Sequence, residues 1–475
     1  MSPTNRTFIW TLWGVSTVVL VLYFASRLNG NDRTVFVPGE TSDGHYQIEL
    51  ACGACHGESF TRAETMQAKC EGCHADSLDE ARDAHPQSKF TDPRNAERAA
   101  LLDARNCVTC HVEHKPEATL SMGITVPSDF CALCHREIGV ERPSHAGIAY
   151  ETCASAGCHN FHDNRALYED FLLKHLHEPA LLAGADLPQR NFASIARHVE
   201  SYPHERFGLE PLAAAQHDAP ADLAFDSSVL EEWGATAHAA SGVNCTACHA
   251  DGASGAWTER PGHMSCSGCH ASEVEGFLHG KHGMRLDAAA NGIDLGPMQP
   301  GSARLPMKPA AADRALSCGS CHGAHRFDTA AAAVESCVGC HDDGHTTAYL
   351  DSAHGRQWLR AEAGEIDAAN AVTCATCHMP RIEKSYDFGA YVHVLVQHNQ
   401  SDNLRPNDKM LRPVCMQCHG LAFSIDALAD PQSIRSNFQG SPAVHVESLE
   451  MAAERKRAID IERQTRTAPA AQVSQ

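Results

Sequence analysis

Residues 52–56 read CGACH and residues 70–74 read CEGCH, and this spacing of two cysteines and a histidine recurs along the chain of 475 residues. Ten segments have the form C-x-x-C-H, and in an eleventh four residues separate Cys153 from Cys158 before His159. The eleven segments use all 22 cysteines. In chain order the pairs are Cys52 and Cys55, Cys70 and Cys73, Cys107 and Cys110, Cys131 and Cys134, Cys153 and Cys158, Cys245 and Cys248, Cys266 and Cys269, Cys318 and Cys321, Cys337 and Cys340, Cys374 and Cys377, and Cys415 and Cys418.

C-x-x-C-H is the attachment pattern of c-type haem. Two thioether bonds hold the porphyrin, and the histidine that follows then lies under the iron as its proximal ligand. Zinc would take four ligands from two such pairs without needing a histidine after each, and a disulfide framework has no use for these histidines. The pattern therefore predicts eleven covalently attached haem c groups. The predicted proximal ligands are His56, His74, His111, His135, His159, His249, His270, His322, His341, His378 and His419.

The chain has 31 histidines, so 20 remain beyond the eleven proximal ones. A second imidazole makes an iron six-coordinate, which suits electron transfer, whereas an open position would permit chemistry. A histidine three or four residues after a proximal one cannot reach the far side of the same iron, and we expect it to bind a neighbouring haem. Four histidines stand at this offset: His114, His162, His325 and His345. The other predicted distal ligands are His45, His85, His145, His238, His263, His282, His354 and His398.

Residues 7–26, TFIWTLWGVSTVVLVLYFAS, carry no charge and are long enough to cross a bilayer as one helix. A cleaved signal peptide is the alternative, but Tyr23 stands where the cleavage site would need a small residue. Trp10, Trp13 and Tyr23 lie toward the ends of the span, as aromatic residues do at membrane interfaces. We expect an uncleaved anchor in a bacterial inner membrane, with the haem-binding part in the periplasm.

The formal charge is −21, from 38 basic and 59 acidic residues. Nucleic acid is an unfavourable partner for so acidic a chain, because binding it depends on basic residues that neutralise phosphates. A basic redox protein suits the charge better. Only 6% of the residues are aromatic, which fits an interior supplied largely by porphyrins. We predict a mainly α fold with long irregular loops and little β structure, in which haem-packed modules follow an N-terminal transmembrane helix.

The motifs form two clusters, five before residue 160 and six after residue 244. The first and second clusters define a predicted five-haem module and a predicted six-haem module. Between them lies a cysteine-free connector whose apolar residues recur at helical spacing, and we expect it to be mostly helical. The predicted divisions are a membrane anchor at 1–30, the five-haem module at 31–165, the connector at 166–235, the six-haem module at 236–425, and a charged C-terminal helix with a disordered tail at 426–475. Residues 287–313 indicate a loop inserted within the second cluster.

Residues 235–425 resemble the hydroxylamine oxidoreductase and octahaem cytochrome superfamily. The resemblance implies that His354 and His398 are distal haem ligands. Catalytic members of that family carry eight haems, whereas this cluster has six motifs, and the C-x-x-C-K motif of the related nitrite reductases does not occur in the sequence. The matching phrases are Cys337-Val-Gly-Cys340-His341 followed by HTTAYLDSAHG, Val372-Thr-Cys374-Ala-Thr-Cys377-His378-Met379-Pro380, His398-Asn399, Leu404-Arg405-Pro406 and Cys415-Met-Gln-Cys418-His419.

Residues 45–165 resemble the class III cytochromes of the c3 and c7 type. The clearest phrase is Cys110-His111-Val112-Glu113-His114-Lys115. Some tetrahaem cytochromes of this class also use the wider spacing seen between Cys153 and Cys158.

Short intervals between motifs force neighbouring haems close together. Only 13 residues separate His56 from Cys70, and 16 separate His249 from Cys266. We therefore expect an electron-transfer protein, not an enzyme, that takes electrons from a quinol-linked membrane donor and delivers them to a periplasmic or outer-membrane redox protein. One alternative is an oxidoreductase acting on hydroxylamine, nitrite or a sulfur oxyanion at one open haem. Another is a protomer of a polymeric haem wire.

Overall fold

The structure, a computed structural model, is mainly helical. The strands within its described parts are β1 (Arg381–Tyr386) and β2 (Tyr391–Val396), which form one antiparallel pair. The prediction of a mainly α fold with long loops and little β structure is confirmed. The residues that the structure describes are 3–30, 32–57, 63–81, 83–153, 160–163, 167–184, 187–189, 210–250, 254–386, 391–402 and 407–467.

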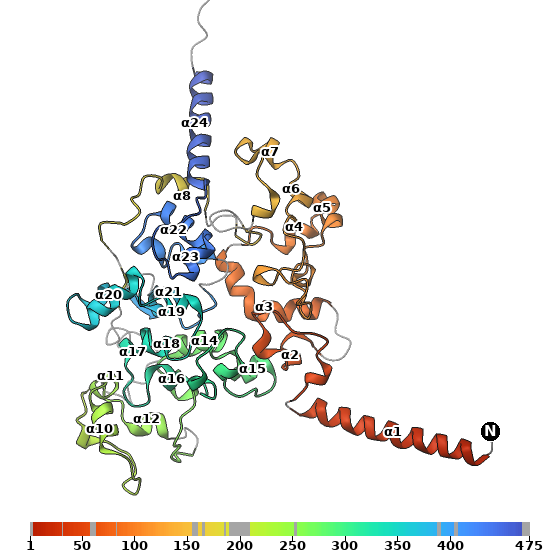
Figure 1. The fold of residues 1–475 in the computed structure, drawn as a ribbon, viewed down its shortest axis with the longest axis vertical. Coiled ribbons are helices and arrows are strands. Elements are labelled where there is room, and N and C mark those ends of the chain that lie inside the picture. The colour runs from red at the N-terminus through yellow and green to blue at the C-terminus, as the bar shows by residue number, and fades with distance from the viewer. Residues whose placement is uncertain are drawn as a thin grey trace, which may run out of the picture.

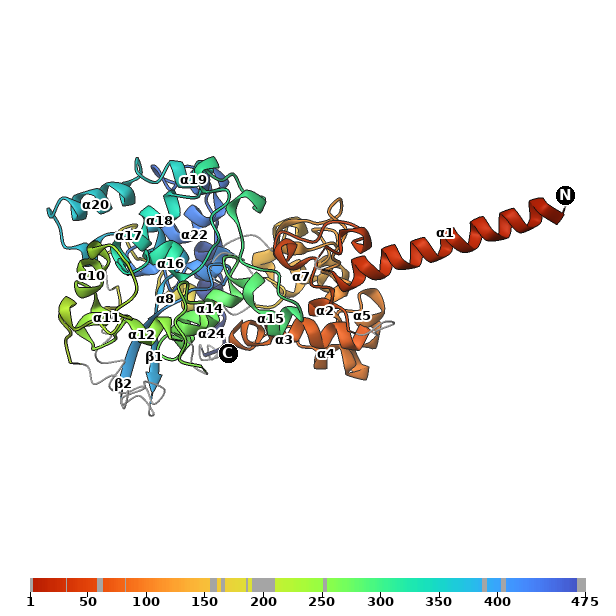
Figure 2. The ribbon, with the colours of Figure 1, turned by 90° about the horizontal axis from the view of Figure 1, so that it is seen from below.

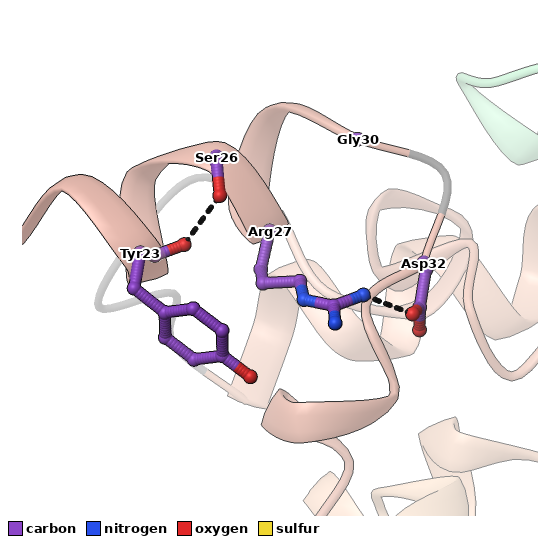
Figure 3. Close-up of a pocket in the computed structure, with 5 residues that line it drawn as sticks. All are labelled: Tyr23, Ser26, Arg27, Gly30 and Asp32. Carbon is purple, nitrogen blue, oxygen red and sulfur yellow. Dashed lines mark hydrogen bonds and ion pairs between the residues drawn. The ribbon is translucent and has the colours of Figure 1, made fainter. Parts of the chain in front are cut away.

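The N-terminal helix α1 (Pro3–Asn29) extends away from the rest of the chain, as Figures 1 and 2 show. Its segment Arg6–Asn29 is long and apolar enough to cross a membrane, and none of it is buried by the protein. Two polar contacts lie at the C-terminal end of the helix. The Ser26 hydroxyl donates to the Tyr23 carbonyl oxygen at 2.7 Å, and Arg27 pairs with Asp32 (Figure 3). Charged groups thus follow the apolar span directly, where a membrane would meet water.

The first cluster is a series of short helices around α3 (Ala63–Ala81), the longest of them (Figure 1). Long stretches without regular structure join these helices. The other α-helices are α2 (Cys52–Cys55), α4 (Gln87–Thr91), α5 (Ala96–Leu101), α6 (Ala132–His135) and α7 (Ile138–Glu141). The 3-10 helices are η1 (Thr34–Phe36), η2 (Tyr46–Ile48), η3 (Pro93–Asn95), η4 (Cys107–Thr109), η5 (Ser121–Gly123), η6 (Pro143–His145) and η7 (Tyr150–Thr152).

The second cluster is built in the same way and also contains the β1–β2 pair. Its α-helices are α10 (Ser227–Gly234), α11 (Ala237–Ala240), α12 (Cys245–His249), α13 (Met264–Ser267), α14 (Ala271–His279), α15 (Ala288–Asn291), α16 (Cys318–His322), α17 (Thr329–Ala333), α18 (Glu335–Val338), α19 (Gly344–Thr347), α20 (Ala353–Glu362) and α21 (Cys374–His378). Its 3-10 helices are η9 (Met284–Leu286), η10 (Pro300–Ser302), η11 (Pro309–Ala311), η12 (Ala368–Asn370), η14 (Asn407–Met410) and η15 (Cys415–Gln417).

The one large cluster of buried apolar side chains lies at the C-terminal end of the described chain, away from most of the cysteine pairs. The helices α22 (Leu421–Ala429), α23 (Pro431–Arg435) and α24 (Ser448–Thr467) build it together with α8 (Glu169–Lys174). Arg455 on α24 pairs with Glu169 on α8 at 2.8 Å. Its buried members are Leu167, Leu172, Met410, Leu411, Val414, Leu421, Ile425, Leu428, Leu449 and Ala452. This unit therefore joins residues from three of the predicted divisions.

The described residues of the connector contain α8, the 3-10 helix η8 (Ala214–Gln216) and α10. Pro179, Pro188, Pro211 and Pro220 lie outside these helices, in keeping with the loss of a backbone donor at proline, which breaks a helix interior. Apolar residues of α8 contact the C-terminal core. Residues 185–186 and 190–209 of the connector lie outside the described residues, so the expectation that it is mostly helical stays a prediction. The tail that we expect to be disordered, after Thr467, lies outside the described residues.

Candidate haem-binding sites

Each cysteine pair with its histidine is described as a site, and the sites are numbered 1 to 11 in chain order. Site 2 lies within α3, and each of the other sites whose residues are all described is a short helical turn, in which the histidine N–H can donate to the carbonyl oxygen of the first cysteine. This bond measures 2.8 Å at His56 and 2.9 Å at His341. Cysteines three positions apart lie on one face of such a turn, so both sulfurs can reach one porphyrin edge. Site 10 also has an N-cap, because the Thr373 hydroxyl accepts from the Thr376 N–H at 3.1 Å.

Ten of the proximal histidines lie within the described residues, and each of them faces a second histidine. The distances between ring centres fall between 5.9 and 6.5 Å. In site order the pairs are His56 with His114, His74 with His45, His111 with His162, His135 with His85, His249 with His325, His270 with His238, His322 with His398, His341 with His282, His378 with His345, and His419 with His354.

This spacing fits an iron bound between two imidazoles. A metal–nitrogen bond of about 2 Å on each side places the two ring centres roughly 6 Å apart. The donor set is also right, because two histidines are a common axial pair for c-type haem in electron transfer. A bare zinc site fits poorly, since no group of three histidine, cysteine, aspartate or glutamate side chains in the described chain could hold a metal ion. None of the described cysteines forms a disulfide.

The histidines at the offset of three or four residues each face the proximal histidine of a different site. His114 follows site 3 but faces His56 of site 1, and His325 follows site 8 but faces His249 of site 6. Both have a left-handed backbone, with φ of +61° and +65°. This conformation is uncommon for residues other than glycine. It turns the side chain away from the haem whose motif has just ended.

Backbone carbonyl oxygens orient many of these rings. Because a carbonyl oxygen only accepts, the Nδ1 of His345 donates to Ile434 at 2.5 Å, and that of His249 donates to Thr258 at 2.7 Å. In a neutral imidazole the other nitrogen, Nε2, then has its lone pair available for a metal. The same Nδ1 bond links His85 to Phe161, His111 to Gly123, His114 to Gly39, His398 to Val396 and His419 to Ala180.

Burial keeps several of these imidazoles neutral. It is the largest cause that lowers the pKa of His238, His282, His354 and His378 to about 4, with a smaller contribution from the facing histidine. Burial disfavours the charged imidazolium, and a histidine must be unprotonated to bind a metal. These four side chains are therefore in the ligand form at neutral pH.

Two predicted distal ligands, His145 and His263, are not members of these ten pairs. All six proximal histidines of the second cluster already face another histidine, so His263 is left without an iron to bind there. It lies near Asp287 instead. His145 ends η6, and its Nδ1 is 3.1 Å from the Ser144 hydroxyl. The nearest proximal histidine in the chain is that of site 5, but Cys158 and His159 of this site lie outside the described residues. The phrase Leu404, Arg405 and Pro406, which contributes to the resemblance of the second cluster, also lies outside them.

Glu113 is a functional residue whose role sequence reasoning missed. The Nδ1–H of His45 donates to Oε1 of Glu113 at 2.6 Å, and the Ser42 hydroxyl donates to the same oxygen at 2.8 Å. The Ser42 N–H donates to Oε2 of Glu113 at 2.5 Å. Burial raises the pKa of Glu113, but the bonds from His45 and Ser42 outweigh it and lower the pKa to about 2. The carboxylate is thus ionised at neutral pH. Its place between His111 and His114 in the sequence is the only available signal.

Replacing Glu113 by glutamine should raise the reduction potential of site 2 by about 60 mV. A carboxylate behind a ligating imidazole increases its basicity and stabilises the ferric state. Losing about 1.4 kcal/mol of that charge-assisted bond corresponds to about 59 mV for one electron. A redox titration followed by absorbance would measure the shift, and Glu365→Gln, which alters an exposed pair with Arg360, is the control. Identical titrations for Glu113→Gln and the unmodified protein would contradict the role of Glu113.

Sulfurs of successive sites approach one another in the second cluster. Cys266 of site 7 hydrogen-bonds Cys318 of site 8, and Cys337 of site 9 hydrogen-bonds Cys374 of site 10. Burial followed by the nearby sulfurs of Cys337 and Cys340 raises the pKa of Cys321 to about 11, which brings sites 8 and 9 together. The remaining neighbours are Cys248 with Cys266, and Cys377 with Cys415 and Cys418. Sites 6 to 11 thus form one row in chain order.

In the first cluster, neighbouring sulfurs connect the sites into two separate groups, sites 1 to 3 and sites 4 and 5. Cys55 lies near Cys73, and Cys70 hydrogen-bonds Cys107, which joins sites 1, 2 and 3. In the second group Cys131 of site 4 hydrogen-bonds Cys153 of site 5.

The bridge between these groups is made of the distal histidines of sites 3 and 4. The Ala84 N–H donates to the His162 carbonyl oxygen at 2.6 Å, and the ring of His85 donates to Phe161 at 2.5 Å. His162 faces site 3 and His85 faces site 4, so these two bonds hold the two sites side by side.

One cavity of about 3610 Å³ runs through both clusters. It is several times larger than the roughly 300–1,000 Å³ of a site for one small ligand. The cysteine pairs of sites 1, 2 and 3 line it, as do those of sites 8, 9 and 10. A continuous hollow of this size, lined by attachment cysteines, is what a series of porphyrins would fill.

The comparison with protein families agrees with this geometry. Residues 44–136 match the family model described as cytochrome c3. The match supports a multihaem electron-transfer cytochrome. The matched segment includes sites 1 to 4 of this cytochrome, and the family implies covalently bound haem c. No curated protein and no solved structure matches the chain. The resemblance of residues 235–425 to the hydroxylamine oxidoreductase superfamily therefore stays a prediction.

Proposed function

We propose that this cytochrome binds eleven haems and conducts electrons from a quinol-linked donor in the inner membrane to a periplasmic or outer-membrane redox protein. The observation that carries the proposal is the facing pair of histidines at each of the ten described proximal positions. Two imidazoles leave no position for a substrate, which favours electron transfer over catalysis. For site 5 we propose His159 and His145 as the axial pair.

The chain's own residues supply attachment, orientation and a dry surrounding. Haem supplies one-electron redox chemistry when bound. The cysteines fix each porphyrin, and the carbonyl bonds to Nδ1 fix the direction of each imidazole. Burial of residues such as His282 and His378 excludes water from the row. Two fixed imidazoles would hold the iron in either oxidation state, so little reorganisation would oppose electron transfer.

Haem counting combined with electron paramagnetic resonance tests this function. We expect an intact mass that corresponds to eleven haems and a spectrum of low-spin ferric iron only. Cyanide, nitrite and hydroxylamine should leave the spectrum unchanged. A high-spin signal that responds to hydroxylamine or nitrite would instead support the alternative, an enzyme with one open haem.

We also propose that α1 stays attached and anchors the protein in the inner membrane, with all eleven sites in the periplasm. The length and apolar character of Arg6–Asn29 support this. The acidic surface, with a net charge of −21, favours a soluble partner with a basic docking face. Attraction of this kind speeds association at low salt and is screened at high salt.

Replacing residues 1–30 by a cleavable signal peptide should release the cytochrome into the periplasmic soluble fraction. The unmodified protein should remain in membranes after a carbonate wash, since a helix of this length inserts stably. Fractionation followed by haem staining measures both. The visible spectrum of the released protein serves as the control and should match that of the anchored protein. A mature native chain that begins after α1 would contradict the anchor.

A further inference from the structure

The two clusters are fastened together beside two distal histidines. The Nζ of Lys281 donates to the carbonyl oxygen of Asp43 at 2.8 Å, and a guanidinium N–H of Arg285 donates to that of Gln47 at 2.9 Å. The donors come from the second cluster and the acceptors from the first. Charged donors make strong hydrogen bonds to carbonyl oxygens. These two bonds, here called the clamp, hold two short segments against each other.

Each segment of the clamp carries a ligand position. His45, between the two acceptors, faces His74 and belongs to site 2. His282, between the two donors, faces His341 and belongs to site 9. The clamp therefore sets the distal sides of sites 2 and 9 next to each other. Figures 1 and 2 agree, because α2 and α3 of the first cluster lie beside α15, which follows the clamp in the chain.

A second set of contacts, from residues 304–308, joins the same two sites. Arg304 donates to the carbonyl oxygen of Thr41 at 3.0 Å and to the carboxylate of Asp43 at 2.9 Å, and its guanidinium lies 4.8 Å from the centre of the Tyr46 ring. Four residues later, the N–H of Lys308 donates to the carbonyl oxygen of Cys340 at 2.8 Å. The predicted loop 287–313 thus connects the neighbourhood of His45 with a cysteine of site 9.

The proximal side of site 2 also meets the second cluster. The neighbouring site 1 meets it too, because a Cβ on Gly53 of α2 would approach the Asn291 carbonyl oxygen of α15 to 4.0 Å. His279, three residues before His282, lies close to His74. Asp287 lies close to Cys73. Residues of the second cluster on both sides of His282 therefore surround site 2.

We propose that electrons cross between the two clusters from site 2 to site 9. With haem bound, His45 and His74 would hold the iron that gives up one electron, and His282 and His341 would hold the iron that accepts it. No bond forms or breaks and no proton moves, because both irons keep two imidazoles. The step rests on the proposed function of the chain as an electron conduit.

The position of site 9 makes the route branch. Site 9 stands inside the row of sites 6 to 11, with sites 8, 7 and 6 on one side and sites 10 and 11 on the other. An electron that enters at site 9 therefore has two directions open to it. The second cluster has two terminal sites, 6 and 11, at which a partner could collect electrons.

Marker variants in the full-length protein test the crossing. A ruthenium photosensitiser attached at Val140→Cys, a position 85% exposed on α7 of the first cluster, injects one electron per flash. His282→Met, His398→Met, His325→Met and His354→Met each give one haem a methionine ligand, which raises its potential and changes its absorption. They mark sites 9, 8, 6 and 11. A static spectrum of each variant shows first whether the marked site is a six-coordinate haem, and its failure there would count against the proposed function itself.

We expect the marker of site 9 to be reduced first and those of sites 8, 6 and 11 later. Reduction of the site 8 marker as early as that of site 9 would overturn the crossing, since His398 also lies near this interface. Equal delays at all four markers would overturn it as well. Delayed reduction at both sites 6 and 11 is the result that the branched route requires.

The clamp itself is tested by Lys281→Ala combined with Arg285→Ala. We expect reduction of the site 9 marker to slow by about tenfold, and amide hydrogens of residues 45–51 to exchange faster, while the static spectrum stays unchanged. Arg326→Ala, which removes an exposed ion pair with Asp328 within the second cluster, is the matched control and should alter neither. Unchanged electron transfer in the clamp variant despite faster amide exchange would overturn the clamp as the device that positions site 2 against site 9.

Discussion

The His354→Ala protein should keep all of its haem and gain one five-coordinate, high-spin iron. His354 faces His419 with 6.1 Å between ring centres, and the His354 side chain is largely buried. Alanine removes the imidazole and leaves no side chain to replace it. Cys415 and Cys418 still hold the porphyrin covalently, so the intact mass should fall only by the change in side chain. Electron paramagnetic resonance should show a new high-spin signal that accounts for one haem.

The open position also gives a functional readout. Cyanide or carbon monoxide should bind one haem of His354→Ala and none of the unmodified protein, because a six-coordinate iron offers no site. His263→Ala is the matched control, since His263 faces none of the described proximal histidines and should leave the spectrum unchanged. A wholly low-spin spectrum for His354→Ala would show that His354 is no ligand. A high-spin signal from His263→Ala would contradict the pairing of the second cluster.

The parts of the sites that follow from local sequence could be predicted. One helical turn fixes the relation between two cysteines and the next histidine, so the motif alone identifies the attachment residues. The offset of three residues also excludes His114 and His325 from their own irons, and the left-handed backbone at both positions gives the physical reason. The pairing itself could not be predicted. His345 faces His378 only because the chain folds back between them, and sequence spacing does not encode that return.

Contacts between distant residues account for the rest. Glu113 acts through Ser42 and His45, which are 71 and 68 positions away, so no local pattern reveals its role. The predicted loop 287–313 is largely irregular, as expected, yet its contact with the first cluster depends on where Arg304 lies in space. The packing of Leu172 on α8 against the C-terminal core is likewise a contact between distant residues that local apolar spacing does not reveal.

Replacing Ile425 by alanine should destabilise the C-terminal core by about 2–5 kcal/mol. Ile425 is fully buried among the apolar side chains that α8, α22 and α24 bring together. Alanine removes three carbon atoms and leaves a cavity that the packed neighbours only partly fill. The effect should be large because porphyrins supply the interior of most other parts of the chain, whereas this cluster has only side chains to hold it.

Hydrogen exchange measures this loss locally, which matters because a chain with several units and covalent cofactors does not unfold in one step. The amides of α22 should exchange about 30-fold faster or more in Ile425→Ala, since each 1.4 kcal/mol corresponds to a factor of ten. Ile461→Ala, at a position 62% exposed on α24, should change exchange little. The N–H of Leu182 donates to the carbonyl oxygen of Cys418 at 2.8 Å, so loosening of this core should also reach site 11. A change in the site 11 spectrum would then show that side-chain packing here helps to hold the last iron of the row.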